Sequence, residues 1–363
     1  MLQKLWVKGF RNLKEVVFDF NDYRAIFLYG ENNQGKSNFL EAIYFLGNLK
    51  SPKEQNLKNM INFQAKEALL GGDFSLDSKI LRLYTKINHE NQKYLLINQK
   101  NVKKVSEVKK YLLIEYLSIE NLRYFLDSPE YRRKSLDNAL ISFVPEFLAI
   151  TRKYERIIKQ KNHLLKQKNN LDQITIWNQE LVILSHKIAQ YRINFLTQLK
   201  QELTPIIKNF QKISHFSFDF QYLFSGEAVN EVDYLEYLKQ KLVQNLDKEL
   251  KLGYSLYGAH RDDFHFFLNN HEIHHFYSRG INILFAILYR ITQLMLLQNK
   301  TKLFPILLLD DIFSELDAEI KQGIVNLIEP KTQVFYTAIN QTDQNLFSNP
   351  LVFNVNNGEL INV

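Results

Sequence analysis

The segment "AIFLYGENNQGKSNFLEAIYFL", residues 25–46, carries the strongest fold signal in the chain. It opens with a short apolar run that ends in glycine, as a buried strand does. Residues 30–37 then fit the pattern G-x-x-x-x-G-K-[ST], and apolar residues follow at helical spacing. A chance glycine turn would not need a strand before it and a helix after it. We therefore predict a phosphate-binding loop.

Each residue type in this loop has a chemical reason to be there. Glycines let the backbone turn successive N–H groups toward a phosphate. Lys36 would neutralise charge on the β- and γ-phosphates and assist catalysis, and the Ser37 hydroxyl would hold Mg²⁺. The helix that follows would direct its positive end at the anion. The predicted nucleotide-binding residues of the loop are Gly30, Glu31, Asn32, Asn33, Gln34, Gly35, Lys36 and Ser37.

A second segment, "PILLLDDIFSELD" at residues 305–317, is an apolar strand that ends in two aspartates. We predict that Asp310 holds Mg²⁺ and that Asp311 orients or deprotonates the attacking water. The alternative is a strand that ends in a turn and caps the next helix, a role that suits Asp317. Two adjacent carboxylates at an apolar strand end repel each other unless a cation is present, which favours the metal site.

Composition restricts the class of protein. The 363 residues are 45% hydrophobic and 23% charged, which is typical of a globular chain. The N-terminus is expected to be a strand and not a signal peptide, and no uninterrupted apolar run reaches the ~18 residues of a membrane span. The absence of cysteine excludes disulfides and thiol catalysis. We expect a cytoplasmic protein whose net charge of +7 weakly favours polyanionic partners.

The pattern along the chain predicts two lobes. Strand-like alternation dominates the first part, a glycine-free stretch rich in Leu, Ile, Lys and Gln follows from 129 to about 214, and alternation returns from 254. We predict an α/β head built from both chain ends, residues 1–118 and 251–363, with an inserted helical lobe at 119–250. The wide separation of Lys36 and Asp310 is typical of ATPases that handle DNA and counts against a transport ATPase subunit.

Five segments together resemble the RecF family, which is related to the heads of SMC and Rad50 proteins. They are "GFRNLKEVVFDF" at the N-terminus, the phosphate loop with its helix, "SPEYRRKSLDNAL", "GAHRDDFHFFLN" and "ILLLDDIFSELD". Ala259 stands where the family's fourth segment has proline. The similarity covers nearly the whole chain, and the inserted lobe is too short for the long coiled coil of SMC proteins. The resemblance implies an ABC-type ATPase head with a short helical arm.

The resemblance also implies a function. Members of the family close as a dimer over two ATP molecules, bind DNA at single-stranded gaps, at single-strand/double-strand junctions or on duplex DNA, and act with RecO and RecR to load recombinase. We therefore expect a weak, DNA-stimulated ATPase of DNA repair and replication with ATP and Mg²⁺ as cofactors. Arg11 and Asn12 stand in the family's F-R-N turn near the nucleotide, although a plain surface turn is the alternative.

The signature loop is "SRGIN" at residues 278–282, which resembles the family's S-x-G-Q-Q-R. Ser278 and Gly280 would contact the γ-phosphate bound by the partner subunit, but Ile281 replaces a glutamine. In one interpretation ATP still closes the dimer, with a loss of about 1.5–3 kcal/mol for a missing hydrogen bond. In the other, the chain is an ATP-binding DNA module with little or no productive hydrolysis.

Several polar groups have two interpretations. Arg132 and Arg133 would contact DNA or form ion pairs, and the basic stretch 152–168 would be a DNA-facing patch or a solvated helix face. His260 and its neighbours at 261–263 are expected to brace the lobe, with a metal site as the alternative. Thr337 and Asn340 are both available to sense the γ-phosphate.

Overall fold

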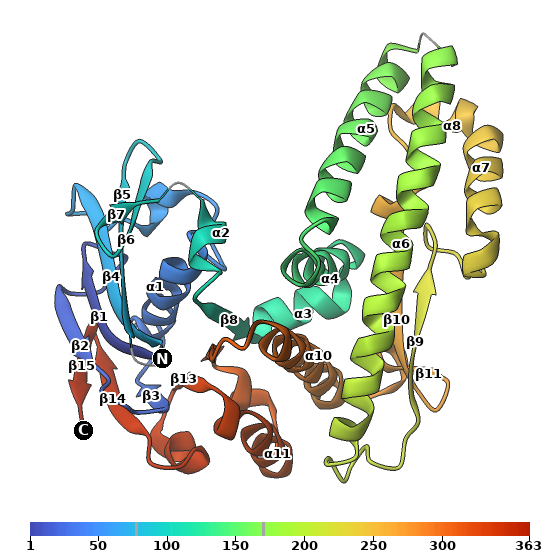
Figure 1. Ribbon diagram of the computed structural model, residues 1–363. Coiled ribbons are helices and arrows are strands. Elements are labelled where there is room, and N and C mark those ends of the chain that lie inside the picture. Colours follow the sequence, from blue (N-terminus) through green and yellow to red (C-terminus); the bar gives the residue numbers. More distant parts are fainter. Residues whose placement is uncertain (77–78, 103, 169–170) are drawn as a thin grey trace. The chain divides into compact units, whose positions relative to one another are not determined.

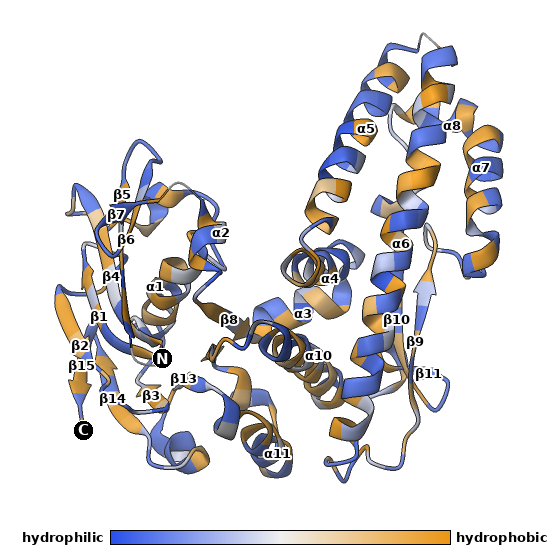
Figure 2. Cartoon of the chain, in the orientation of Figure 1, coloured by the Kyte–Doolittle hydropathy of each residue, from blue (hydrophilic) through white to orange (hydrophobic). Residues whose placement is uncertain are grey.

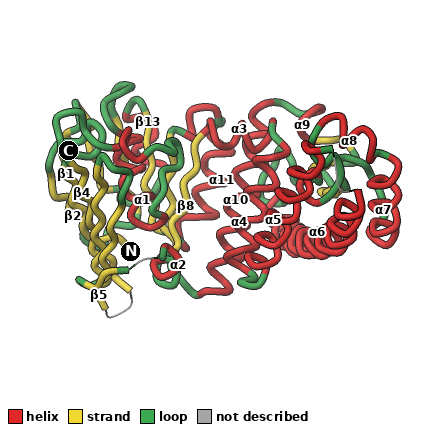
Figure 3. Tube along the Cα trace, turned by 90° about the horizontal axis from the view of Figure 1, so that it is seen from above, coloured by secondary structure: helices red, strands yellow, loops and turns green. Residues whose placement is uncertain are grey.

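The computed structural model describes residues 1–76, 79–102, 104–168 and 171–363 (Figure 1). The chain divides into unit 1, Met1–Leu122 with Gln298–Val363, and unit 2, Arg123–Leu297. Unit 1 is an α/β head built from both chain ends, and unit 2 is mostly helical, as the red segments in Figure 3 show. The predicted fold class is confirmed.

One sheet of unit 1 has the strand order β15-β14-β3-β13-β12-β8, parallel except for β15. Both β12 and β13 are buried at every residue, so neither sequence alternates between buried and exposed positions. Strand β12 is apolar from Pro305 to Leu309, whereas β13 also buries the polar side chains of Gln333 and Thr337. The carboxyl ends of β3, β12 and β13 therefore share one edge of the sheet. The strands are β3 (Ala25–Tyr29), β8 (Leu113–Ser118), β12 (Pro305–Asp310), β13 (Gln333–Ala338), β14 (Leu351–Asn356) and β15 (Glu359–Asn362).

A second sheet in unit 1 is antiparallel, with the order β2-β1-β4-β5-β6-β7. Its strand β5 alternates buried and exposed residues, because one face packs on the core and the other faces solvent. The strands are β1 (Leu2–Lys8), β2 (Val16–Asp19), β4 (Glu67–Leu76), β5 (Lys79–Asn88), β6 (Lys93–Ile97) and β7 (Lys100–Asn101).

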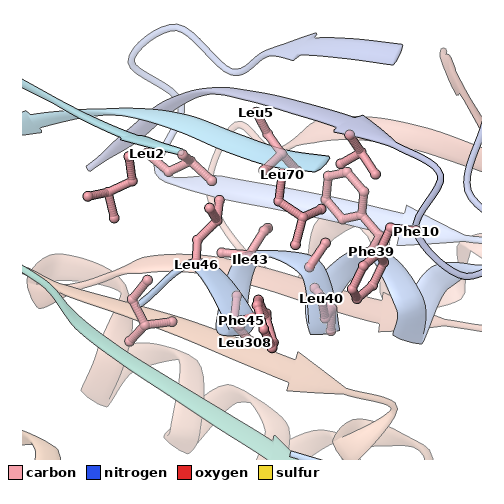
Figure 4. Packing of buried hydrophobic residues seen from close by; sticks show 14 of the residues in the cluster. Leu2, Leu5, Phe10, Phe39, Leu40, Ile43, Phe45, Leu46, Leu70 and Leu308 are labelled. Atoms are coloured by element: carbon pink, nitrogen blue, oxygen red, sulfur yellow. The ribbon is translucent and has the colours of Figure 1, made fainter. Parts of the chain in front are cut away.

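Helix α1 (Lys36–Asn48) packs between these two sheets and forms the core of unit 1. In Figure 4 its residues Phe39, Ile43 and Leu46 lie against Leu5 on one sheet, and Leu308 lies on the other side. Burial of α1 on both sides explains the apolar spacing seen in the sequence. The phosphate loop is therefore attached to a helix that is buried between two sheets.

Unit 2 centres on two long helices, α5 (Phe147–Gln167) and α6 (Leu171–Ile207), which pack against each other. Figure 2 shows hydrophobic and hydrophilic bands along both helices, as expected of amphipathic helices with one buried face. Leu181, Leu184, Ile188, Tyr191 and Phe195 recur in the sequence at spacings of three and four, which predicts one helix face. On α6 all of them are buried except Tyr191, which is partly exposed. The other helices of this part are α3 (Ile119–Asp127), α4 (Pro129–Phe143), α7 (Tyr234–Gln244) and α8 (Leu246–Leu252).

The second predicted domain boundary, at residue 250, differs from the division of the structure. Residues 251–297 belong to unit 2, because β10 (Asp263–Leu268) pairs with β9 (Phe218–Leu223) and with β11 (His271–Glu272). The alternating stretch that begins at residue 254 forms a strand only at 263–268, and residues 259–261 form a 3-10 turn. The sequence places this segment in the head, whereas the strand pairs within unit 2, because alternation does not identify a strand's partner.

Helix α10 (Arg279–Thr301) bears on the expectation that no segment is apolar enough to span a membrane. It is long and apolar enough to cross a membrane by length and composition alone, but 67% of its most apolar stretch is buried inside the fold. Burial of Ile283, Phe285 and Leu288 identifies it as a core helix. The remaining helical elements are α2 (Val105–Val108), α9 (Ile273–Phe276), α11 (Ala318–Ile328) and the 3-10 turns η1 (Leu57–Met60), η2 (Glu231–Asp233), η3 (Ala259–Arg261), η4 (Ile312–Glu315), η5 (Glu329–Lys331) and η6 (Gln341–Leu346).

Candidate functional site

The phosphate loop joins β3 to α1. Gly30, Asn33 and Gly35 have φ values of 151°, 63° and 116°, in the left-handed range that favours glycine and is tolerated by asparagine. At Gly30 an added Cβ would lie 2.4 Å from the carbonyl oxygen of Val355, so only glycine fits. Within the described residues no side chain caps the first turn of α1, which leaves its N–H groups available to an anion.

Lys36 lies folded into this loop. Its Nζ donates to the carbonyl oxygens of Gly30 at 2.5 Å and Glu31 at 2.8 Å, and the residue is almost entirely buried. Burial lowers the pKa of Lys36, while the nearby carboxylates of Asp311 and Asp310 act in the opposite direction. A buried ammonium at the mouth of a loop of N–H groups is suited to receive phosphate oxygens.

Asp310, at the end of β12, lies directly against the loop. Its Oδ1 accepts hydrogen bonds from Ser37 Oγ at 2.8 Å and Thr337 Oγ1 at 3.1 Å. Its Oδ2 accepts from Lys53 Nζ at 2.8 Å and from the Tyr116 hydroxyl. Burial alone would raise the pKa of Asp310, but the Lys53 ion pair and these hydrogen bonds hold it below its ordinary value. The carboxylate is therefore ionised in a buried setting.

The hydroxyl of Ser37 and the carboxylate of Asp310 are hard oxygen donors, which is the ligand type that Mg²⁺ prefers. Mg²⁺ is usually held by one or two protein oxygens together with phosphate oxygens and water. The pair fits that pattern, since it lies beside the loop and leaves most of the coordination shell to other ligands.

Asp311 follows in a left-handed conformation, with φ 56°. Its N–H donates to Thr337 Oγ1 at 2.9 Å, which ties the end of β12 to β13. Burial first, and then the charge of Asp310, raise the pKa of Asp311 above its ordinary value. A half-buried carboxylate with a raised pKa beside a phosphate site has the properties of a general base.

Two residues of the F-R-N turn, Arg11 and Asn12, have different roles. Arg11 donates from Nε and Nη2 to both oxygens of the fully buried Glu41, at 2.9 Å each, so it braces α1. Asn12 lies at the loop, where its Nδ2 donates to the Asn33 carbonyl at 3.3 Å and its Oδ1 accepts from Asn38 at 2.8 Å. Of the two, Asn12 is the residue placed beside the nucleotide loop.

Gln34 has a bracing contact that its position in the motif does not suggest. Its Oε1 accepts from the Asn357 N–H at 2.7 Å, and its carbonyl oxygen accepts from Gly358 at 2.8 Å. The β14–β15 turn thus holds the phosphate loop from outside. Glu31 and Asn32 remain exposed, and a groove of about 670 Å³ beside the loop is lined in part by Glu31 and Asn340.

The signature loop lies in unit 2, at the start of α10. Ser278 and Arg279 are exposed, and the Ser278 carbonyl oxygen accepts from the backbone N–H of Asn282 at 3.0 Å. The Asn282 side chain is buried and donates to the carbonyl oxygens of Tyr277 and Ser278 at 3.1 and 3.3 Å. Asn282 therefore stabilises the turn that presents Ser278 and Gly280.

The two arginines of α4 form internal contacts. Arg132 makes a bidentate ion pair with Asp263, with nitrogen–oxygen distances of 2.7 and 2.8 Å, and Arg133 donates to the Asp262 carbonyl oxygen at 2.6 Å. Arg132 therefore forms an ion pair inside unit 2, as one of its two interpretations predicts.

Asp317 accepts from the Ile320 N–H at 3.0 Å, which confirms the predicted N-cap of α11.

His260 braces unit 2, as expected. Its Nδ1 lies 2.7 Å from the Tyr154 hydroxyl, its Nε2 lies 3.2 Å from the Ser255 carbonyl oxygen, and burial lowers its pKa to about 3. Among the described residues no group of three or more His, Asp or Glu side chains could hold a metal ion. The side chains of the basic stretch 152–168 differ in their exposure. Lys161 is fully buried, while most of the other cations face solvent.

Sequence reasoning missed three side chains of the site. Lys53 and Tyr116 contact Asp310, and Glu41 holds both Arg11 and the Ser51 hydroxyl. None of them belongs to a recognisable motif. A charged residue at a helical core position, as Glu41 is on α1, was the one available signal.

Comparisons with known proteins agree with this geometry. Residues 1–358 match the family model described as the RecF/RecN/SMC N terminal domain. The chain is 30% identical over 370 residues to the DNA replication and repair protein RecF of Staphylococcus carnosus, with 99% of both chains covered. It is 29% identical to the RecF protein of Halothermothrix orenii, with 98% of this chain and 97% of the other covered.

Solved structures show the same fold. The recombination mediator protein RecF of the RecFOR pathway, solved with the nucleotide ATPrS, superposes with a TM-score of 0.84 at 26% identity, covering 100% of this chain and 98% of that chain. The same mediator protein solved with ATP gives 0.83. An SMC head bound to the C-terminal winged-helix domain of ScpA gives 0.58 at 14% identity, with 100% and 97% covered, a likeness of fold alone.

Proposed function

Because the chain belongs to the RecF family, we propose that it is an ATP-dependent DNA-binding protein of recombinational repair and replication. The observation that carries the proposal is the 2.8 Å hydrogen bond between Ser37 and Asp310, which joins two motifs 273 positions apart. Only a fold that brings the phosphate loop to the acidic strand end makes that contact. The chain resembles structures of RecF with ATP over its whole length.

In this proposal ATP binds at the phosphate loop of unit 1. Backbone N–H groups of residues 30–37 and the Lys36 ammonium receive the β- and γ-phosphate oxygens. Ser37 and Asp310 hold Mg²⁺, which neutralises charge on the phosphates. Asp311, with its raised pKa, orients a water molecule and accepts its proton during a slow, DNA-stimulated hydrolysis.

The dimer is the second part of the proposal. Ser278 and Gly280 of one copy contact the γ-phosphate held by the other, through the N-terminus of α10. Asn282 supports this interpretation of the altered signature, because its amide holds the turn from inside. The alternative, an ATP-binding DNA module without productive closure, is favoured by the loss of a polar side chain at Ile281.

DNA contact is proposed for a groove of about 1230 Å³ in unit 2, between α4, α5 and the segment around η3. Four exposed cations line it, namely Lys134, Lys159, Lys166 and Arg261, and they outnumber the two exposed carboxylates of Glu130 and Glu155. A polyanionic backbone is the natural occupant of such a lining, and gapped or junction DNA offers one. Cooperation with mediators of the RecO and RecR type belongs to the same proposal.

ATP dependence is tested with gapped DNA. We expect tighter DNA binding with Mg²⁺·ATP than without nucleotide, and loss of that difference in Lys36→Ala. Sedimentation of Asp311→Asn with ATP separates the two interpretations of the signature, because turnover is blocked. A monomer at micromolar concentration would exclude ATP-driven closure and favour the alternative.

The groove is tested separately by charge reversal. Lys159→Glu with Lys166→Glu should weaken binding to any DNA sequence and reduce the slope of log affinity against log salt by about two. The matched control is Lys248→Glu, an exposed lysine of α8 outside the groove. Equal effects of the control and the groove variants would remove the groove from the proposal.

A further inference from the structure

Lys53 is a cation at the metal-binding carboxylate that no motif predicts. Its Nζ lies 2.8 Å from Asp310 Oδ2 and 5.6 Å from the centre of the Tyr116 ring. Two attractive groups therefore hold one ammonium, the carboxylate by charge and the ring by a cation–π contact. About a third of the Lys53 side chain remains exposed, so it has a path to solvent.

The carboxylate of Asp310 has no acceptor position to spare. Its two oxygens offer about four lone-pair sites. Ser37 and Thr337 donate to one oxygen, and Lys53 and Tyr116 donate to the other. A divalent cation that binds Asp310 must therefore replace or push aside one of these donors.

Among the four donors Lys53 alone carries a charge. A Mg²⁺ ion at Asp310 would repel the ammonium, whereas the three hydroxyl groups have no net charge to repel it. Electrostatics thus identifies Lys53 as the group that leaves. The exposed part of its side chain means that the ammonium reaches water without unfolding the head.

The backbone around Lys53 is held firmly, so that the side chain moves by itself. Ser51 Oγ accepts from the Lys53 N–H at 3.0 Å and from the Glu54 N–H at 2.9 Å, and it donates to Glu41 on α1. The turn is thereby attached to the helix that begins at the phosphate loop. Lys53 is presented to Asp310 from a fixed base.

We propose that Lys53 is a resident counter-ion that competes with Mg²⁺ for Asp310. It pairs with the buried carboxylate before the metal binds, and it is displaced when the metal enters with the nucleotide. Lys53 is a positioning residue that sets how much Mg²⁺ the site requires. This inference rests on the proposed function, since it assumes that Mg²⁺ accompanies the nucleotide at Asp310.

The test uses the full chain with Lys53→Met, which removes the charge and keeps the length, and Lys53→Arg, which keeps the charge. Lys58→Met is the matched control, because it removes an exposed lysine five positions along the same segment. The first readout needs no nucleotide. In EDTA, Lys53→Met should lower the melting temperature by about 2–4 °C, with Lys53→Arg and Lys58→Met close to the parent.

The second readout is the Mg²⁺ concentration at which a fluorescent ATP analogue is half-bound. Removal of the competitor should lower that midpoint about fivefold in Lys53→Met, which corresponds to about 1 kcal/mol. An unchanged or higher midpoint overturns the inference, and so does weaker binding of the analogue without metal, because Lys53 would then contact the nucleotide. Failure of the parent protein to bind the analogue at all would instead refute the proposed function.

Discussion

The pair Lys161–Glu249 in unit 2 allows a quantitative prediction. Both side chains are completely buried, and Lys161 Nζ lies 2.7 Å from Glu249 Oε2. Removing one partner of a buried ion pair costs about 3–5 kcal/mol, because the other charge stays in a low dielectric. In Lys161→Met, the Ser255 hydroxyl and the Leu256 N–H still donate to Glu249 Oε1. We therefore expect the lower end, a loss of about 3 kcal/mol.

The double variant Lys161→Met with Glu249→Leu should recover most of that loss, because replacing both charges by apolar groups of similar size is often neutral or stabilising. The chain has two tryptophans, Trp6 in unit 1 and Trp177 in unit 2. In a Trp6→Phe background, Trp177 reports on unit 2 alone, next to the cluster of Leu164 and Leu165.

Urea denaturation followed by this fluorescence gives the unfolding free energy of unit 2. The control is Lys159→Met, an exposed lysine two positions away. The reasoning is refuted if Lys161→Met stays within about 1 kcal/mol of the parent, or if the double variant is no more stable than the single one.

Three further predictions concern other parts of the molecule. Gly71→Ala should lower the melting temperature of unit 1, read by Trp6 fluorescence, because the new Cβ would lie 1.9 Å from the Trp6 ring. Asp311→Asn should keep ATP binding but reduce phosphate release by about 10²-fold or more, since it removes the proposed base; unaltered release would reassign that role. Asp263 raises the pKa of His265, so this pair's stabilisation is complete below the unfolded histidine's pKa of about 6.5 and fades as pH rises through the folded value. His265→Gln should flatten the melting temperature against pH in that window, and an unchanged profile would contradict the assignment.

The nucleotide site could be predicted from sequence because its parts are local. A phosphate loop needs its glycines, lysine and serine within eight residues. An acidic strand end can likewise be recognised from a short segment of about six residues. The role of Lys53 could not be predicted from sequence, because it is not local. It lies in an irregular segment, and its role depends on Asp310, which is 257 positions away.

The contacts in unit 2 that could not be predicted also join residues that are far apart in the sequence. Arg132 and Arg133 looked able to contact DNA because their acceptors at 262 and 263 are remote in sequence. The alternating stretch from residue 254 contains the strand 263–268, but alternation did not predict that this strand pairs with β9. Residue type and spacing predict an element, and only packing determines its neighbours.

The order in which the chain leaves the ribosome bears on how unit 1 forms. Unit 2 is one continuous stretch, whereas β3 must wait for β12, β13 and β14 before its sheet can close. Leu2 and Gln333 hydrogen-bond across 331 positions. Such non-local pairing is slow and exposes unpaired strand edges in the meantime. The central sheet of unit 1 therefore closes only after the whole of unit 2 has been synthesised.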